Sequence, residues 1–483
     1  MPIVKSIGVT PTERLLADLC ERTFLTLWSY PSPCKDDGKE LCDLLVVFGD
    51  HVFIFFDRES QKFDRVGKDI LHSWAGWKKD AIDKQITTAH GAARYLRSAR
   101  GIFLDAKQAI PFPLAIPAGA SIHKIVVAHG AKEACASFSE ANVSGSLAIS
   151  YGHSLPAAFF PFMVGLDKND IVHVFDSENL EILFGMLDTL FDFTAYITEK
   201  ERAIGQYDAI FYCGEEDLLA HYILGYDKKQ NRYTIGTGEQ DIDALIIAEG
   251  EWQRFAQQPV FQRREHANQG SYLWDELIQL TCRNALNGTL LGDADLLRGE
   301  SALREMAREP RLQRRALSEN MRKAITTFPD MPGDVRKVSL MPSFYKDVAY
   351  VFLQLKTERP LDYEREYRPL RQQALAIACG AAKERHPSLQ KVIGIAIDAP
   401  RFTRAGSEDF LLLDCSDWSE ETAAYYREAN LHWEFFTTPH LSARRLKTSD
   451  FPPPPRPQPK PGRNAPCTCG SGQKSKKCCY GAA

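Results

Sequence analysis

The chain has 483 residues, of which 44% are hydrophobic and 25% charged, and its formal net charge is −4 at pH 7. This length predicts two to four domains, and the near-neutral balance excludes nucleic-acid binding driven by overall charge, so such a surface would have to be local. The first 15 residues lack the basic start and apolar run of a signal peptide, and the longest apolar stretch, of about 12 residues, is too short to span a bilayer, so we expect a cytoplasmic protein without membrane insertion.

The first predicted elements are a helix, a β-hairpin and a second helix. Apolar residues at helical spacing predict the first helix, with Thr12 as its cap. Two apolar runs separated by Gly49-Asp50 predict the hairpin. These elements are expected at 11–28, 41–48, 51–57 and 77–97.

The order helix, acid-bearing hairpin and helix resembles the PD-(D/E)XK nuclease superfamily. Within it, residues 38–58 (GKELCDLLVVFGDHVFIFFDR) are similar to nuclease-related domains. The resemblance implies a restriction-endonuclease-like core, which we expect within 1–150. It also implies a site where two carboxylates and a lysine converge, hold Mg²⁺ and position water for cleavage of nucleic acid.

The hairpin register tests which residues could form such a site. In a two-residue hairpin Phe48 faces His51, so Asp43 pairs with Phe56 and shares a face of the sheet with Arg58. Asp43 then matches the first acid that the resemblance implies. Phe56 stands at the position of the second acid and cannot bind a metal, and Arg58 stands where the lysine is expected.

Two further acids could complete the site. Asp57 points to the opposite face in this register, and a β-bulge could turn it toward Asp43. Glu21, in the preceding helix, could supply another carboxylate. The catalytic candidates are therefore Asp43, Asp57, Arg58 and Glu21. The alternative is that Asp43 and Arg58 form a half-buried ion pair in an inactive nuclease-like fold that only binds.

The centre of the chain, 151–448, predicts a second α/β region of unknown role. Strands alternate with amphipathic helices, which is typical of mixed α/β or α+β folds. Its strands are expected at 171–176, 348–355, 391–398 and 409–413, and one more strand is expected before it, at 123–129. The helices are expected at 178–203, capped by Ser177, and at 215–224, 310–325, 369–385 and 419–431.

The C-terminal end combines a proline-rich linker, 449–461, with a cysteine-rich module, 462–483. Proline at this density favours an extended spacer of about 3 Å per residue. The module holds Cys-x-Cys, eight residues and Cys-Cys, a spacing that suits a tetrahedral, all-thiolate Zn²⁺ site with structural function. The ligands are Cys467, Cys469, Cys478 and Cys479.

These residues resemble the SEC-C motif, the zinc module at the C-terminus of the SecA preprotein translocase ATPase. The Gly-Ser-Gly turn at 470–472 and the lysines before the last cysteine pair also match. The resemblance implies an interaction module that contacts proteins and ribosomes. From residue 451 onward the chain has six basic residues and no acid, which suits an acidic protein surface or RNA, although the lysines could instead only offset the thiolate charge.

We therefore expect a multidomain α/β protein whose leading function is binding to a protein or ribosomal partner through the zinc module. The alternative is an enzyme, a Mg²⁺-dependent endonuclease acting at Asp43. No phosphate loop of the Gly-x₄-Gly-Lys-Ser/Thr type occurs in the sequence, so no P-loop ATPase is indicated.

Overall fold

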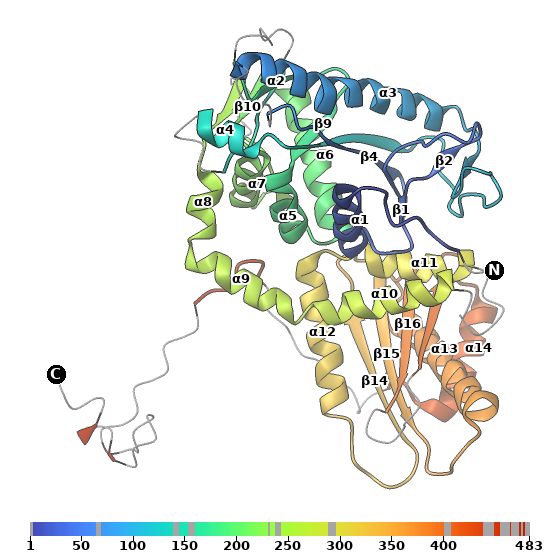
Figure 1. The fold of residues 1–483 in the computed structure, drawn as a ribbon. Helices are drawn as coiled ribbons and strands as arrows, with labels where there is room; N and C mark the ends of the chain where they lie inside the picture. Colours follow the sequence, from blue (N-terminus) through green and yellow to red (C-terminus); the bar gives the residue numbers. More distant parts are fainter. Residues whose placement is uncertain are drawn as a thin grey trace.

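The computed structural model describes most of the chain up to residue 454 and isolated residues beyond it. The described ranges are 3–63, 69–138, 144–152, 160–229, 232–236, 243–287, 296–399, 407–437 and 449–454, with Asn464, Gln473, Lys474, Lys477 and Cys478 farther on. These residues form a mixed α/β protein with several sheets, as expected (Figure 1). None of the helices in these ranges is both long and apolar enough to cross a bilayer.

A five-stranded sheet organises the N-terminal lobe. Its order is β1 (Ser29–Pro31), β3 (Leu44–Phe48), β4 (His51–Glu59), β6 (Ser121–His129) and β9 (His173–Asp176). Strand β3 is antiparallel to β1 and β4, whereas β4, β6 and β9 are parallel. The predicted hairpin register is confirmed, because Phe48 pairs with His51. The carboxyl ends of β4, β6 and β9 consequently meet at one edge.

Helices cover both faces of this sheet (Figure 1). One face carries α1 (Pro11–Phe24), α5 (Ser177–Met186) and α6 (Leu190–Gln206); the other carries α2 (Ile70–Lys78), the π-helical segment Lys79–Asp83 and α3 (Lys84–Arg97). Phe53 and Phe55 of β4 pack on Phe24, Phe184 and Phe193. Odd-numbered residues of β4 therefore face α1, α5 and α6.

Several predicted helix ends differ from the observed ones. Thr10, not Thr12, caps α1 through its side chain, and the helix stops before Leu25, whose φ is 66°. The helix predicted over 178–203 is two helices, because Thr189 caps a new start. Asp176, not Ser177, caps α5. A short polar side chain that accepts the free N–H groups fixes each start more firmly than apolar spacing does.

A second sheet lies beside the first in the same lobe. Its order is β13 (Ala244–Ile247), β10 (Ala209–Tyr212), β7 (Ala148–Gly152) and β8 (Met163–Asp167). Two strand pairs are β2 (Cys34–Lys35) with β5 (Ile102–Phe103) and β11 (Tyr226–Asp227) with β12 (Arg232–Tyr233), and further helices are α4 (Lys132–Phe138), α7 (Glu215–Leu224) and α8 (Glu251–Ala256). The expected boundary at 150 falls inside β7, and β9 from beyond it joins the first sheet, so the lobe extends past that boundary.

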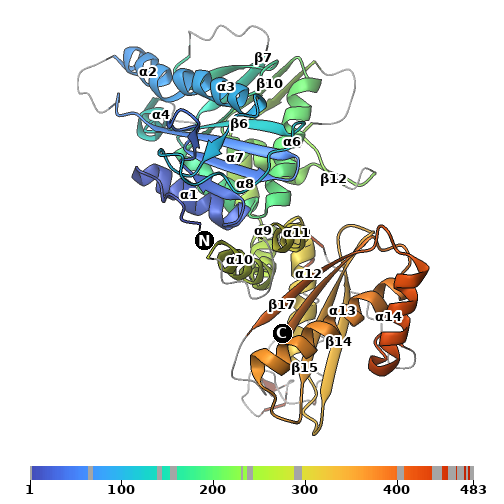
Figure 2. The ribbon, with the colours of Figure 1, turned by 90° about the vertical axis from the view of Figure 1, so that its right-hand side faces the viewer.

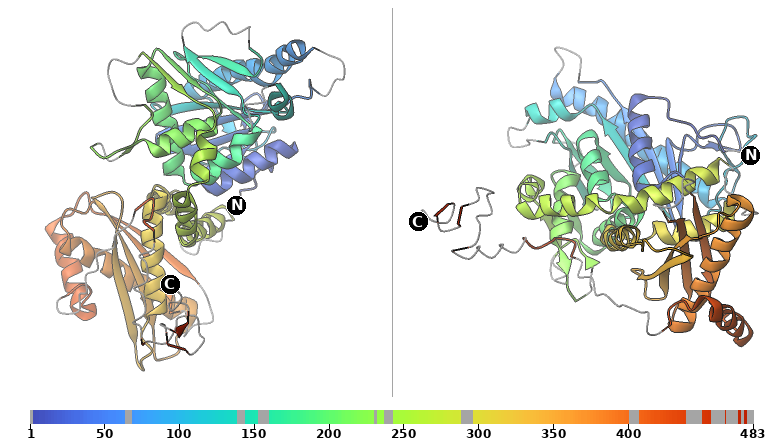
Figure 3. Two further views of the ribbon diagram at one scale, coloured as in Figure 1. Left: turned by 90° about the vertical axis from the view of Figure 1, so that its left-hand side faces the viewer. Right: turned by 90° about the horizontal axis from the view of Figure 1, so that it is seen from below.

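Helices from the middle of the chain separate this lobe from a C-terminal one (Figures 2 and 3). They are α9 (Pro259–Gln269), α10 (Tyr272–Leu286), α11 (Leu296–Ala307) and α12 (Arg311–Thr326). The C-terminal sheet has the order β14 (Val335–Pro342), β15 (Val348–Lys356), β16 (Lys391–Asp398) and β17 (Glu408–Asp414). The π-helical segment Tyr363–Tyr367 leads into α13 (Arg368–Arg385), which packs with α14 (Glu420–Trp433).

Candidate functional site

Asp43 and Asp57, two of the predicted catalytic residues, lie side by side. The backbone N–H of Asp57 donates a hydrogen bond to Asp43 Oδ2 at 2.6 Å. The β3–β4 ladder begins at Leu44, which pairs with Phe55. Asp57 lies beyond this pair, and its N–H is bound by the side chain of Asp43. Strand β4 keeps regular register with β6 from His51 to Glu59, but Asp43 N–H donates to Phe55 O although Leu44 is the partner of Phe55, so the irregularity lies on the β3 side.

Asp57 continues into a chain of hydrogen bonds that sequence reasoning missed. His129 Nε2 lies 2.8 Å from Asp57 Oδ2, and His129 Nδ1 lies 2.9 Å from Ser177 Oγ. The Thr12 hydroxyl donates to the other Asp57 oxygen, Oδ1. Side-chain exposure is 1% for Asp57 and 7% for His129, so the chain is buried apart from the half-buried Ser177 and Thr12.

The topology explains why these residues meet. Asp57 and His129 stand at the carboxyl ends of β4 and β6, and Ser177 opens α5 directly after β9. In open α/β sheets, ligands bind outside the carboxyl ends of parallel strands. A polar residue ends each of the three predicted strands, but the sequence does not show that these strands are neighbours. A carboxylate, an imidazole and a hydroxyl in this order can move a proton from the hydroxyl to the imidazole while the carboxylate stabilises the resulting charge.

The electrostatic environment of Asp43 is unusual for an aspartate. Burial raises the pKa of Asp43 to about 7, the hydrogen bond from Asp57 opposes the rise, and the nearby carboxylates of Glu40, Glu13 and Asp57 add to it. A carboxyl group whose pKa is raised by burial and by like charges is a common feature of functional sites. Structural clusters of acids also produce it.

The other two predicted catalytic residues are not brought to this site. Arg58 is exposed, and within the described part of the chain it makes no hydrogen bond or ion pair with either acid. Glu21 lies about 13 Å farther along α1 than Thr12, from the helical rise. It accepts a hydrogen bond from Gln279 and pairs with Arg283 of α10. Its position on the helix therefore directs it to the helical layer between the lobes.

The carboxylates fit a Mg²⁺ site only in part. Both Asp57 oxygens already accept hydrogen bonds, and Phe56, at the position of the second acid, is a buried apolar side chain. Mg²⁺ requires near-octahedral oxygen ligation, for which two neighbouring carboxylates are a minimal set. The arrangement does not match the site implied by the nuclease resemblance.

The C-terminal metal ligands fall mostly beyond the described residues. Cys467, Cys469 and Cys479 lie outside them, and Cys478 is half-buried. The N–H of Lys477 donates to Lys474 O at 2.8 Å, which forms a turn directly before Cys478. Among the donor sets available in proteins, four thiolates at this spacing fit tetrahedral Zn²⁺.

The base of the tail is fixed to the body. Asp450 accepts hydrogen bonds from Arg264 of α9, Arg315 of α12 and Tyr233 of β12. Phe451 packs edge-on against Phe255. We call residues 449–452 the strap, because they tie the linker to the junction of the lobes.

Comparison with known proteins identifies one feature of the chain. Residues 463–481 match the model of the SEC-C motif, which is typically a zinc-binding module. Searches of the curated proteins and of the solved structures found no match. The C-terminal segment thus carries a SEC-C motif, and the match does not extend to the two lobes.

Proposed function

We propose that this chain is a zinc-binding SEC-C protein whose C-terminal module docks on a protein or ribosomal partner and brings the two-lobed body to it. The observation that carries the proposal is the SEC-C match over 463–481, which contains all four cysteines of the tail. Four thiolate ligands leave zinc without an open position. The metal then has a structural role, and the surface that it folds performs the binding.

The charge of the tail supports a binding role. Basic residues flank the cysteines, and no acid occurs after residue 450. Four thiolates on Zn²⁺ leave a charge of −2, which the basic residues exceed. A small positive module is attracted to an acidic protein surface or to ribosomal RNA, and this attraction weakens as salt is added.

The strap supports delivery of the body. Arg264 and Arg315 are largely buried, with 7% and 9% of their side chains exposed, and both pair with Asp450. Burying two arginines around one carboxylate holds the start of the linker at a defined place on the body. A partner captured by the module would therefore remain near the helices between the lobes.

Partner capture by the full chain tests this proposal. Deleting 461–483 should remove the captured partner, and Cys469→Ser should do the same by releasing the metal. Cys213→Ser, a half-buried cysteine in the body, is the matched control and should retain the partner. Unchanged partners in the deletion variant would refute the docking role.

The second candidate is Mg²⁺-dependent cleavage of nucleic acid by a nuclease-like body. One observation favours it: Asp43 and Asp57 are in contact at the end of a hairpin that follows a helix. Occupied Asp57 oxygens and an exposed Arg58 count against it. We therefore rank this function second and derive no catalytic step through Mg²⁺.

Incubation of plasmid DNA or RNA with the full chain and Mg²⁺ tests the second candidate. Cleavage that is lost in Asp43→Ala and kept in Glu21→Gln would establish it. Equal products from the unmodified chain and Asp43→Ala would eliminate it.

A further inference from the structure

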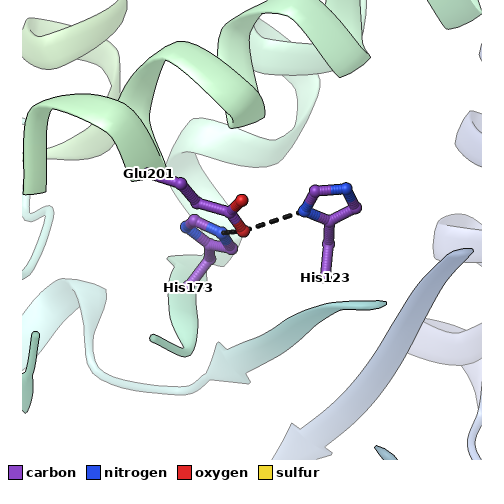
Figure 4. A group of neighbouring side chains, drawn as sticks. All are labelled: His123, His173 and Glu201. Atoms are coloured by element: carbon purple, nitrogen blue, oxygen red, sulfur yellow. Dashed lines mark hydrogen bonds and ion pairs between the residues drawn. The ribbon is translucent and has the colours of Figure 1, made fainter. Parts of the chain in front are cut away.

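A second polar cluster lies at the opposite ends of the same parallel strands. It consists of His123 near the start of β6, His173 at the start of β9 and Glu201 of α6 (Figure 4). His123 Nδ1 and His173 Nε2 lie 2.8 and 3.1 Å from the same oxygen, Glu201 Oε1. Both imidazoles are buried, and 28% of the Glu201 side chain is exposed.

Strand register brings the two histidines together. His173 pairs with Ile125 of β6, and His123 is two residues before Ile125. Alternate residues of a strand share a face, so both rings lie on the face that α6 covers. Glu201 projects from α6 between them, as Figure 4 shows. The convergence is therefore fixed by the sheet and by one packed helix.

The spacing of the three groups is close to that of a metal site. One ligand atom from each residue can be chosen so that all lie within 4.8 Å of one another. Ligands about 2.0–2.1 Å from a tetrahedral metal are separated by roughly 3.3 Å. The observed separations of 2.8 and 3.1 Å would need to open by only a few tenths of an ångström.

The ring of His123 has a second polar neighbour besides Glu201. His51 Nδ1 lies 2.9 Å from His123 Nε2. When a metal on Nδ1 replaces the hydrogen bond to Glu201, the ring proton of His123 moves to Nε2, within reach of His51 Nδ1. Metal-binding histidines commonly donate their other N–H to such a neighbour.

His173 and Glu201 also have geometry that a metal could use. The contacts of His123 Nδ1 and His173 Nε2 with Glu201 Oε1 are the ones that a bound metal would replace. His173 Nδ1 has no hydrogen-bond partner among the described residues and can carry the proton when Nε2 binds a metal.

We propose that His123, His173 and Glu201 bind a divalent transition-metal ion of the Zn²⁺ type. Two imidazoles and one carboxylate are ligands that zinc and its neighbours in the first transition row accept. Three protein ligands leave a coordination position open, so this metal can bind water, unlike the ion in the thiolate module. His51, which contacts His123, also lines a cavity of about 1320 Å³.

Titration of the full chain with Co²⁺ distinguishes this site from the tail. Cobalt bound by four thiolates gives an intense sulfur-to-metal charge-transfer absorption, which cobalt bound by nitrogen and oxygen lacks. The unmodified chain should bind one equivalent that adds only weak visible bands, in addition to the thiolate-bound ion. Glu201→Gln should lose that equivalent and keep the charge-transfer band.

His90→Ala is the matched control, because His90 forms a single histidine–carboxylate pair with Asp170 on the same lobe. It should retain both equivalents. The amide in Glu201→Gln can still accept a hydrogen bond at a partly exposed position, so unchanged far-ultraviolet circular dichroism is expected; if that variant unfolds, His123→Asn replaces it. A folded Glu201→Gln or His123→Asn chain that binds as much Co²⁺ as the unmodified chain would overturn the proposal.

Discussion

The backbone N–H of Asp57 donates a hydrogen bond to the Asp43 carboxylate at 2.6 Å, at the point where β3 no longer pairs with β4. This contact joins the end of the hairpin to the chain of hydrogen bonds through His129 to Ser177. The buried acid at its start makes the stability of the lobe depend on pH.

Asp43→Asn should remove a stability loss that occurs between about pH 4 and pH 7. The pKa of Asp43 is raised to about 7 from 3.8, so the folded chain keeps a proton that the unfolded chain has lost. Stability therefore falls as pH rises through this window and is constant above it. The penalty above pH 7 is on the order of a few kcal/mol.

Urea unfolding of both chains at pH 5 and pH 8 measures this effect. The asparagine oxygen still accepts the Asp57 N–H. The free energy of unfolding of the variant minus that of the unmodified chain should therefore be larger at pH 8 than at pH 5. An identical pH dependence in the two chains would show that Asp43 is ionised at neutral pH.

Thr12→Val should destabilise the N-terminal lobe. Its hydroxyl donates to the buried Asp57 carboxylate, and hydrogen bonds to charged groups contribute about 1.5–3 kcal/mol. Thr87→Val is the control, because among the described residues the Thr87 hydroxyl bonds to the carbonyl of Asp83, in an exposed turn of helix, and to no carboxylate. Thermal unfolding should show a clear loss for Thr12→Val alone; equal losses would mean that the bond to Asp57 adds nothing.

Asp450→Asn should loosen the strap without unfolding the lobes. The carboxylate neutralises Arg264 and Arg315, and a buried arginine without its partner costs about 3–5 kcal/mol. When 449–452 detaches, both arginines become hydrated. The free energy of unfolding therefore falls by no more than the free energy needed to detach the strap. Hydrogen exchange should rise at the amides of 449–451, the strap residues that carry an N–H, while β4 and β15 stay protected. Unchanged exchange in the strap would contradict this.

Arg371→Met should destabilise the C-terminal lobe by about 3–5 kcal/mol. Arg371 of α13 is fully buried and bridges Asp398 at the end of β16 and Asp409 of β17. Its removal leaves the buried Asp398 carboxylate without this cation, whereas Asp409 keeps Arg368. Arg371→Lys should also lose stability, because one ammonium group cannot reproduce both contacts. Hydrogen exchange of α13 and β17 measures the effect, and protection equal to that of the unmodified chain would refute it.

Sequence patterns predicted those helices and strands whose ends are set by neighbouring residues. Helix α7 and strand β16 were expected at the observed bounds, since each is a continuous periodic segment with clear ends. The β3–β4 register followed from the two-residue turn, which fixes strand pairing by geometry. The same register placed Asp43 at the open end of the hairpin.

Contacts between parallel strands could not be predicted in this way. The pairing of β6 with β4 and β9 depends on long crossovers, and no turn sets its register. His129 and Ser177 therefore could not be joined to Asp57 from the sequence, nor His123 to His173. Glu21 was a candidate because it lies in the helix that precedes the hairpin, whereas the helical rise carries it away from the site.

Metal analysis of the full chain purified under reducing conditions tests the zinc module most directly. Cys469→Ser should contain one equivalent of zinc less than the unmodified chain, with the melting temperature of the body unchanged because the linker separates the two. Equal zinc in both chains would contradict coordination by the cysteines of the SEC-C motif.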